Sequence, residues 1–594
     1  MNFFIDINKL LQLLNRKEKR RFLFLIFFSV IIAFLESISI SSIVPFMSLA
    51  LDPEMLKKSN ILGFLYNYFN FEAFNSFVIT LGCIVFSLLT ATNFLGLILI
   101  KMMNQYVSDC NTSISHRLLK TYINYDYEFF INSNSSEILK NIVSEVQLMV
   151  FNFLQPLVNV IVKSFLIFGL FIMLLLINPL ITSIAVFVFL SSYMLSYLLT
   201  NKTSISLGKS REKIDTKRFL FLSNIVGGIK EIKLFNTEEF FVQRFKNEAF
   251  KFGNTVAKQA TISVIPKHVI ESIIYGGLVL TIIISISVVY DVEKLIPLLI
   301  LFGLAGFRII PSLQLVYTSI LRMRFYSKTL NTIHKLNSER KIKTKALDQA
   351  ANLDTEFESI KLEDISFTYD NTSKDILKNI SINIKKGEKI GLVGKTGSGK
   401  SSLVNLMLGL LKPTSGNIFF NNELITSSNF IFKNEVGHVS QQLFFLDGTL
   451  KENIFFGEEF DDERLLKVYE ICCLDDFLSK YKNKFDYYIG ENGSRLSGGQ
   501  RQRLAFARAL VRNPSILIID EGSNALDNIT ENKIFNNIIN KTEVSSMIII
   551  SHKLKSLIEC DRILLLDNGE IVDQGTYKKL SETNELFQSL IKFE

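Results

Sequence analysis

The chain has 594 residues, more than one ordinary domain needs, so we expect at least two domains. Apolar residues make up 48% of it and charged residues 21%, which excludes a disordered chain, a collagen and a small disulfide scaffold. The net charge of +8 is small for this length and argues against a nucleic-acid partner. The five cysteines are scattered and contain no C-x-x-C pair, so the sequence predicts neither a zinc site nor a disulfide framework.

Long apolar stretches alternate with polar, basic ones over the first half of the chain. A bilayer core of about 30 Å needs roughly 20 apolar residues per helix. Stretches of that length are 22–50, 77–100, 153–177, 180–200, 269–290 and 295–322, which predicts six membrane spans. A large soluble helical protein is the poorer interpretation, because runs such as 165–177 are apolar on every face.

The loops between these stretches predict the orientation of the chain. The connections near 178 and 291–294 are very short, whereas 101–150 and 201–268 are long and polar. Because basic loops stay on the cytoplasmic side, we expect the N-terminus, the two long loops and everything after 322 in the cytoplasm. Residues 62–71 are predicted as a short amphipathic helix at the outer membrane surface.

The second half has a different pattern. After Arg324 the chain becomes polar, and from about 358 short β-branched runs alternate with helical patterns, as in α/β proteins. We therefore expect a transmembrane domain over 1–327, a helical linker over 328–357 and an α/β domain over 358–594.

A glycine-rich loop follows the apolar run 389–393 and precedes a helical pattern at 401–411. The pattern G-x-x-x-x-G-K-[ST] between a strand and a helix predicts a phosphate-binding loop, whose backbone N–H groups surround phosphate oxygens. Lys400 would bring a positive charge to the β- and γ-phosphates of ATP, and the Ser401 hydroxyl can bind Mg²⁺. The residues predicted to bind ATP here are Gly394, Lys395, Thr396, Gly397, Ser398, Gly399, Lys400, Ser401 and Ser402.

A fully apolar run, 515–519, ends in two acids. This is the pattern of a buried parallel strand, whose carboxyl end lies where open α/β sheets bind ligands. Asp520 is predicted to bind Mg²⁺ directly or through water, and Glu521 to orient and polarise the attacking water.

The segment LSGGQ at 496–500 lies between these two motifs. It is the signature of the ATP-binding cassette (ABC) ATPases, and the chain resembles that family over nearly its whole length. The resemblance implies that Ser497, Gly498, Gly499 and Gln500 contact the γ-phosphate of an ATP held by the phosphate-binding loop of a second subunit. Asp527 corresponds to the loop that contacts the second subunit at the same site.

Other positions take their roles from the same resemblance. Tyr369 matches the aromatic residue that stacks on adenine, and Gln441 matches the glutamine that senses Mg²⁺ and faces the membrane domain. His552 matches the histidine that contacts the γ-phosphate. The expected catalytic residues are therefore Glu521, His552 and Gln441, and the expected Mg²⁺ ligands are Ser401, Gln441 and Asp520.

Six spans fused to one cassette are similar to an ABC exporter half-transporter. The resemblance implies a homodimer in the bacterial inner (cytoplasmic) membrane, with the nucleotide-binding domain in the cytoplasm and ATP and Mg²⁺ as its cofactors. It also implies coupling helices in the two long loops, for which the candidates are 129–138 and 224–235, and transport by alternating access.

Charged residues inside the spans indicate the substrate, because they are costly in a bilayer. Arg308 and Lys267 are predicted to line the substrate cavity; Lys163 and Glu36 are further candidates, for which snorkelling or an internal ion pair are equal alternatives. Segments 34–54, 227–235 and 307–313 resemble bacterial lipid-linked oligosaccharide flippases, which implies a polyprenyl-pyrophosphate glycan. The alternatives are an exporter of a lipid A-type lipid or of a peptide or drug, and a nucleotide-gated channel or regulator on the same scaffold.

Overall fold

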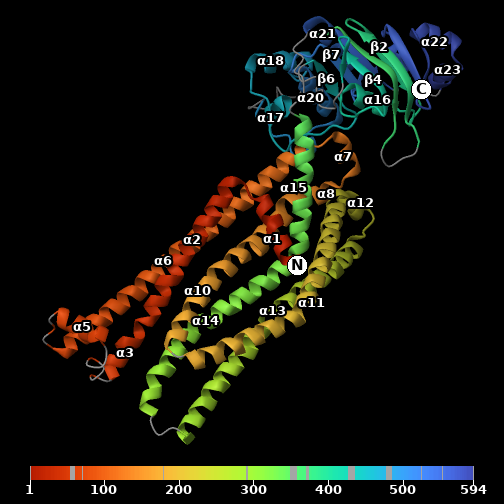
Figure 1. Ribbon diagram of the computed structural model, residues 1–594. Helices are drawn as coiled ribbons and strands as arrows, with labels where there is room; N and C mark the ends of the chain where they lie inside the picture. Colours follow the sequence, from red (N-terminus) through yellow and green to blue (C-terminus); the bar gives the residue numbers. More distant parts are fainter. Residues whose placement is uncertain are drawn as a thin grey trace. The chain divides into compact units, whose positions relative to one another are not determined.

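The computed structural model describes the chain apart from residues 1, 52, 54–55, 57–59, 70, 72, 178, 289–291, 348–356, 370–373, 426–434, 476–484, 523–524, 552 and 593–594, and apart from some helical side chains, mainly between 270 and 304. It forms two compact units. Unit 1 comprises Met1–Tyr125 and Asn132–Lys345, and unit 2 comprises Asp126–Ile131 and Ala346–Glu594. Unit 1 consists of long helices, and unit 2 of sheets with shorter helices (Figure 1).

The elements of unit 1 are all helical within the described residues. They are α1 (Asn2–Leu13), α2 (Arg16–Ser41), α3 (Ile43–Leu51), α5 (Asn60–Tyr68), α6 (Phe74–Ile123), α8 (Ser135–Leu139), the π-helical turns η1 (Lys140–Glu145) and η2 (Val150–Leu154) with α9 (Val146–Met149) between them, α10 (Gln155–Ile177), α11 (Pro179–Gly227), α12 (Ile229–Leu234), α13 (Glu238–Val288), α14 (Val292–Phe325) and α15 (Ser327–Leu347). The first span helix begins sharply at α2, because Asn15 and Glu18 form a reciprocal capping box there.

Within the described residues, four helices are long and apolar enough to cross a membrane. They are Arg16–Met47, Phe74–Ile123, Ser135–Ile177 and Thr182–Gly227, which overlap the first four predicted spans. The fifth and sixth predicted spans lie along α13 and α14, where many side chains are outside the described residues. The 50 residues of α6 extend about 75 Å, far beyond a hydrocarbon core of about 30 Å, so much of this helix lies outside the apolar layer.

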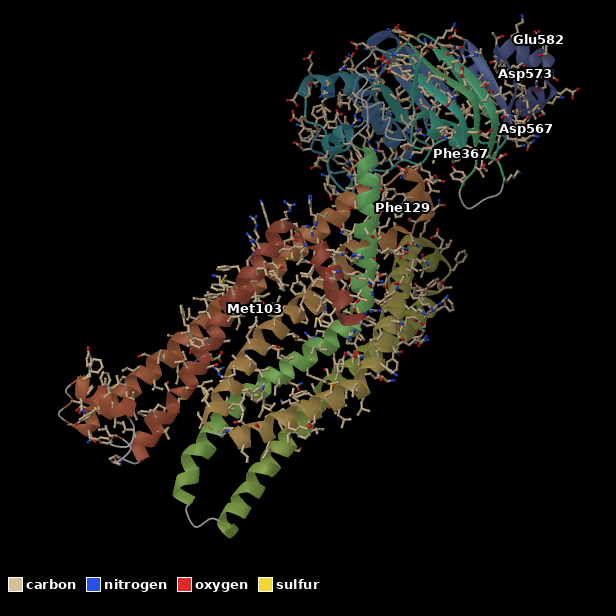
Figure 2. The ribbon with its side chains drawn as sticks, in the orientation of Figure 1. Met103, Phe129, Phe367, Asp567, Asp573 and Glu582 are labelled. Carbon is tan, nitrogen blue, oxygen red and sulfur yellow. The ribbon has the colours of Figure 1, made fainter. Side chains whose placement is uncertain are left out.

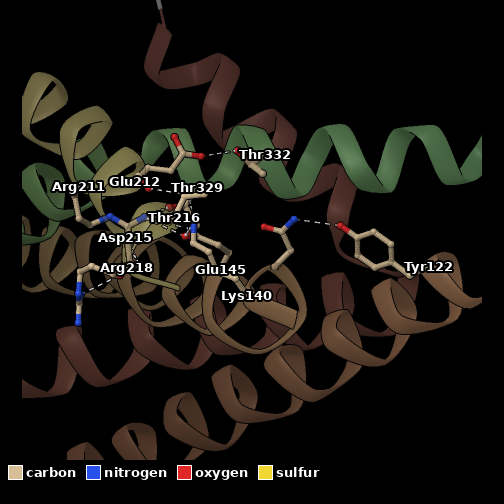
Figure 3. Close-up of polar contacts among 11 residues, drawn as sticks. Tyr122, Lys140, Glu145, Arg211, Glu212, Asp215, Thr216, Arg218, Thr329 and Thr332 are labelled. Carbon is tan, nitrogen blue, oxygen red and sulfur yellow. Dashed lines mark hydrogen bonds and ion pairs between the residues drawn. The ribbon is translucent and has the colours of Figure 1, made fainter. Parts of the chain in front are cut away.

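A cluster of buried charges joins three helical segments of unit 1 (Figure 3). Arg211 of α11 and Glu145 of η1 approach to 3.3 Å, and the Lys140 ammonium lies 3.1 Å from the same carboxylate. Arg211 also donates to Thr329 Oγ1 of α15 at 2.9 Å. Because oppositely charged and accepting groups surround Arg211, the cost of burying its charge is offset, and the cluster ties α15 to α11 and η1.

The structure corrects the limits of the first predicted coupling helix. Instead of one helix over 129–138 there are two, α7 (Tyr127–Asn132) and α8. The physical reason is Asn134, whose side chain accepts a hydrogen bond from the Ser136 N–H and so starts a new helix. Residues 127–131 of α7 belong to unit 2, in which Lys412 Nζ lies 3.3 Å from Asp126 Oδ2. The second candidate, 224–235, contains the short helix α12.

Unit 2 contains two sheets. One is antiparallel, with the order β2-β1-β4-β5, and the other has the order β10-β9-β3-β8-β7-β6, in which all strands but β10 are parallel. The strands are β1 (Ser359–Phe367), β2 (Leu377–Lys385), β3 (Lys389–Gly394), β4 (Ser415–Phe420), β5 (Glu423–Ile425), β6 (Val436–Val439), β7 (Ile516–Asp520), β8 (Ser546–Ile550), β9 (Arg562–Asp567) and β10 (Glu570–Gly575).

Helices and short turns of unit 2 connect these strands. They are α16 (Lys400–Met407), α17 (Leu450–Phe455), α18 (Asp462–Ile471), η3 (Glu491–Gly493), α20 (Gly498–Leu510), α21 (Asn528–Lys541), η4 (Leu554–Leu557), α22 (Tyr577–Thr583) and α23 (Glu585–Lys592). Strand β7 is almost wholly apolar and buried, as its sequence predicts for a central parallel strand. Because β6, β7, β8 and β3 run parallel, the loops after their carboxyl ends meet at one edge of the sheet.

Candidate functional site

The phosphate-binding loop occupies the carboxyl end of β3. Gly394 ends the strand and Gly399 precedes α16 in a left-handed conformation, with a φ of +106°. A Cβ at Gly399 would lie 2.8 Å from Leu377 Cδ2, and a Cβ at Gly394 would lie 2.1 Å from Leu566 O. The turn therefore requires glycine at both positions, and it presents backbone N–H groups at the start of α16, where anions bind.

Two side chains of this loop fit a polyphosphate. Ser398 is buried, and its Oγ has no hydrogen-bond partner within the described residues, an arrangement that a phosphate oxygen would relieve. Lys400 Nζ donates to Gly394 O at 2.7 Å and to Lys395 O at 3.0 Å. Burial lowers the pKa of Lys400, and the nearby carboxylates of Glu521 and Asp520 oppose that effect. A cation, an unpaired hydroxyl and backbone amides thus converge on one loop.

The two acids lie at the end of β7, and β8 alone separates β7 from β3. Gln441, which follows β6, donates from Nε2 to Glu521 Oε2 at 2.9 Å. Glu521 has a φ of +50°, and its backbone N–H donates a hydrogen bond to Ile550 O at 2.9 Å. Such strained backbone clusters at functional sites, where the surrounding structure fixes it. The structure therefore brings together two of the three predicted catalytic residues, while His552 lies outside the described residues.

The predicted Mg²⁺ ligands come from three of these elements. Ser401 is in the first turn of α16, Asp520 ends β7 and Gln441 follows β6. No group of three or more His, Cys, Asp or Glu side chains is placed to hold a metal ion in the described part of the chain. The predicted ligands are oxygen atoms of a serine, an amide and one carboxylate, a set typical of Mg²⁺ that is also bound by phosphates.

The signature segment begins α20. The Ser497 hydroxyl accepts from the Gln500 N–H and the Gln500 side chain accepts from the Ser497 N–H, which closes a capping box. Gly499 lies so close to the loop before α21 that a Cβ there would meet Ala525 O at 3.1 Å. No hydrogen bond joins 497–500 to the phosphate-binding loop among the residues that the structure describes. The N-terminus of α20 is thus separate from the phosphate-binding loop in hydrogen bonding within the described residues, and its contact with a phosphate stays a prediction.

The remaining predicted ATP contacts lie on the flanks of these motifs. Tyr369 Oη is 3.2 Å from Ser402 Oγ, and its ring packs edge-on against Phe367, which Figure 2 labels, with 4.8 Å between ring centroids. The Asp527 carboxylate caps α21 by accepting from the Thr530 N–H, and this hydrogen bond lowers the pKa of Asp527. Their roles toward ATP stay predictions.

One residue that anchors the signature helix was missed by sequence reasoning. Arg508 of α20 donates to Phe444 O at 2.6 Å and to Asn453 O at 2.8 Å, and its guanidinium lies over the rings of Phe445 and Phe456. Burial lowers the pKa of Arg508 to about 10, so it is still charged at pH 7. It ties the signature helix to the loop that follows Gln441. No local sequence signal marks it, because all of its partners are more than 50 residues away.

A second site lies among the span helices of unit 1. It is a pocket of about 520 Å³ between α2, α6, α10 and α14. Its polar lining includes Ser29, Thr92, Asn93, Asn104, Gln155 and Asn159. Its apolar lining includes Ile32, Leu97, Ile100, Met103, Val162 and Leu166, of which Figure 2 labels Met103. Hydrogen-bonding and apolar surface thus face one cavity.

The charged residues of this pocket are Glu36, Lys163 and Arg308. Arg308 Nε lies 3.1 Å from Glu36 Oε1, and Arg308 Nη2 donates to Asn93 Oδ1 at 2.8 Å. Glu36 therefore forms an internal ion pair, one of the alternatives named for it. Lys163 lines the same pocket. Lys267 does not line it; its ammonium lies 3.7 Å from Glu271 Oε1 on α13, and its place in a substrate cavity stays a prediction.

Two protein-family models match the chain. The ABC transporter transmembrane region matches residues 21–308, and the ABC transporter model matches residues 377–524. The chain belongs to the ABC transporters. The predicted fold class, a polytopic helical membrane domain of the ABC exporter type fused to an α/β P-loop cassette, is confirmed. In the given sequence this ABC transporter carries one membrane domain and one ATPase domain, which is the arrangement of an ABC exporter half-transporter.

Relatives and a solved structure agree with this assignment. A putative ABC transporter ATP-binding protein of Mycoplasma genitalium is 31% identical over 420 residues, 66% of each chain. The ATP-dependent lipid A-core flippase of Wigglesworthia glossinidia brevipalpis is 26% identical over 498 residues, 81% of the transporter and 83% of the flippase. A bacterial Atm1-family ABC exporter with ATP bound has a TM-score of 0.78 at 17% identity, over 97% of the transporter and 99% of that chain, which is a likeness of fold.

The match with several curated relatives is partial. The transporter spans 66% of the Mycoplasma relative and 41% and 52% of two other similar proteins.

Proposed function

We propose that this ABC transporter is half of an ATP-driven exporter that flips an amphiphilic lipid with an anionic head group across the bacterial inner membrane. The best candidate is a lipid-linked oligosaccharide, a polyprenyl-pyrophosphate glycan. The observation that carries the proposal is the pocket of about 520 Å³ among the span helices, which combines Arg308 and Lys163 with amide side chains and apolar walls. Cations and amides suit phosphate oxygens and sugar hydroxyls, and the apolar walls suit a lipid chain.

ATP hydrolysis would be carried out at the edge of the large sheet of unit 2. Lys400 and the backbone amides of its loop bind and orient the β- and γ-phosphates. Glu521 orients the attacking water and polarises it, while Gln441, which donates to Glu521 at 2.9 Å, positions that carboxylate. Bound Mg²⁺ would neutralise phosphate charge, with Ser401 and Asp520 as the residues that hold it. Only a difference in ATP affinity between two conformations can drive transport.

The separation of the phosphate-binding loop from the signature segment supports a homodimer. The signature helix α20 begins at Ser497 and makes no hydrogen bond to the phosphate-binding loop among the described residues. Two chains arranged head to tail would place the signature of one beside the loop of the other and so complete two equal ATP sites. Both sites would be competent, because the loop, the strand acids and the signature are all present in the chain.

A lipid A-type glycolipid is the second candidate substrate. It is favoured by the similarity to a protein named as an ATP-dependent lipid A-core flippase, which covers 81% of this chain. Both candidates are phosphorylated glycolipids, so they share the chemistry that the pocket offers. Export of a peptide or drug, or a channel or regulator role, would need no cation at the position of Arg308.

The deciding experiment is ATP-dependent translocation in proteoliposomes. A fluorescent polyprenyl-pyrophosphate oligosaccharide and a fluorescent lipid A-type glycolipid are reconstituted separately, and their movement is compared with that in vesicles that carry the Glu521→Gln variant. Flipping of the first lipid alone supports the lipid-linked oligosaccharide. Flipping of the second alone moves the assignment to lipid A-type lipids. No flipping of either, with ATPase activity intact, rejects this substrate class.

A further inference from the structure

The three charged groups of the span pocket are not equivalent. Arg308 is already paired: Glu36 lies 3.1 Å from its Nε, and Asn93 accepts from its Nη2 at 2.8 Å. The Glu36 side chain is the more buried partner, at 16% exposed against 43% for Arg308. The Lys163 side chain has no ion pair or hydrogen bond to any residue that the structure describes, although it lines the same pocket. One cation is therefore neutralised and the other is not.

This arrangement leaves the pocket with one uncompensated positive charge. A ligand with one negative charge would be balanced by Lys163 alone. A ligand with two or more negative charges has charge left over after Lys163, and its second anionic group can compete with the Glu36 carboxylate for Arg308. The guanidinium favours such an exchange, because its planar donors bind carboxylate and phosphate groups in the same manner.

We propose that Glu36 is a displaceable counter-ion that holds Arg308 in the empty pocket and yields it to the second phosphoryl group of a diphosphate lipid, while Lys163 binds the first. The proposal rests on the proposed function and adds the residue that sets its selectivity. Glu36 is a positioning residue. Before the lipid binds, Glu36 holds the Arg308 guanidinium toward Asn93. When Arg308 pairs with Glu36 again after the pocket changes conformation, the Glu36 carboxylate repels the anionic head group and so favours its release.

The same geometry explains why an apolar environment tolerates an acid here. A lone carboxylate within a span is costly, and so is a lone guanidinium, but the pair is neutral and Asn93 satisfies a further donor. Removing the Glu36 charge would leave Arg308 without a counter-ion, although still hydrogen-bonded to Asn93, and so strengthen its attraction for an anionic ligand. A role for Glu36 that is merely structural predicts the opposite, namely weaker or unchanged binding of every ligand.

The test measures equilibrium binding to the full-length protein in detergent, without nucleotide. The probes share one hydrocarbon and differ in charge: farnesyl diphosphate, farnesyl methyl phosphate and farnesol. For the wild type we expect the diphosphate to bind most tightly and farnesol most weakly. Glu36→Gln should tighten diphosphate binding about tenfold, tighten the phosphodiester less and leave farnesol unchanged, whereas Lys163→Gln should weaken the diphosphate about tenfold.

Controls separate charge from folding. Glu271→Gln removes an acid of the same unit that pairs with Lys267 and does not line the pocket, so it should leave all three affinities unchanged. Glu36→Asp keeps the charge and should restore wild-type affinities in a protein with the same elution volume. A lipid A-type glycolipid is also added as a competitor of farnesyl diphosphate. Its competition shows whether the two negative charges can come from a lipid A-type head group as well as from a diphosphate.

The outcomes are distinct. If the wild type prefers the diphosphate but Glu36→Gln binds it no more tightly, the counter-ion role is overturned and the proposed function stands. If the wild type binds all three probes equally, the anionic substrate class fails and the inference fails with it.

Discussion

Arg211 and Glu145 form an ion pair from which solvent is excluded: their closest nitrogen and oxygen atoms are 3.3 Å apart, and each side chain is 1% exposed. The pair joins α11 to η1, and Thr329 extends it to α15 (Figure 3). Glu145→Gln leaves two buried cations, Arg211 and Lys140, without their shared carboxylate. We expect the free energy of unfolding to fall by about 3–5 kcal/mol, measured from the thermal unfolding of the purified transporter.

A matched control exists on α13. Glu248→Gln breaks the pair with Lys251, whose side chain is 61% exposed, and should cost less than about 0.5 kcal/mol. The double variant Arg211→Met, Glu145→Leu should be more stable than Glu145→Leu alone, because it also removes the Arg211 charge that Glu145→Leu leaves buried without its carboxylate, while Lys140 loses Glu145 in both variants. Equal melting temperatures for Glu145→Gln and the wild type would contradict the role of this pair.

The contact between Gln441 and Glu521 leads to a prediction for ATP turnover. Glu521→Gln keeps the shape of the side chain but removes the carboxylate that we propose polarises water, so kcat should fall by about 10²–10⁴. ATP binding should persist, because Lys400 and its loop are unchanged, and the nucleotide-bound form, which we propose is a dimer, should accumulate. Phosphate release and nucleotide binding measure the two effects. Glu585→Gln, at the start of α23, is the control and should hydrolyse ATP normally.

Arg508 should be as important for the ATPase unit as the motif residues. Arg508→Ala removes the donor that satisfies Phe444 O and Asn453 O, and we expect a loss of about 3 kcal/mol in stability. Since the loop after Gln441 loses its attachment to α20, ATPase activity should fall as well. Arg512→Ala is the comparison, because Arg512 is more exposed and pairs with Glu458 at the surface. A melting temperature for Arg508→Ala no lower than that for Arg512→Ala would exclude this role.

His438 predicts a specific dependence of stability on pH. Burial lowers its pKa from 6.5 to about 4, and its Nε2 has no hydrogen-bond partner within the described residues. Between these two values the unfolded chain binds more protons than the folded chain, so stability falls as the pH falls from 6.5 to 4. The resulting loss in the free energy of unfolding should be about 2 kcal/mol at pH 5 and absent at pH 7.

Melting curves at pH 7 and pH 5 test this dependence. The destabilisation at pH 5 should be smaller for His438→Gln than for the wild type, whereas His116→Gln, which changes an exposed histidine, should behave as the wild type does. The same pH dependence in all three proteins would show that His438 is not its source.

The features that sequence predicted well are those written in short segments. The phosphate-binding loop is specified by Gly394 to Ser401 and the signature by five consecutive residues, because a strand end or a helix start needs its own backbone chemistry. The span helices follow from length and apolarity. Long-range pairs were less accessible: nothing local links Glu36 to Arg308, so the sequence left that acid with three alternative roles.

Local exceptions also escaped sequence reasoning. A single asparagine, Asn134, divides the predicted coupling helix, since its side chain competes for a backbone N–H. Lys140 and Glu145 belong to a π-helical turn, where the usual helical spacing of side chains does not apply, so the contact between Lys140 and Glu145, which also pairs with Arg211, has no periodic signal.

The uninterrupted length of α6 has a mechanical consequence. Its 50 residues contain no proline, and hydrogen bonds along the whole helix make it a stiff rod. For a rod of about 75 Å, a tilt of about 5° at one end displaces the other end by about 6 Å, more than one helical turn. Small angular changes at one end of α6 are therefore converted into displacements of several ångströms at its other end.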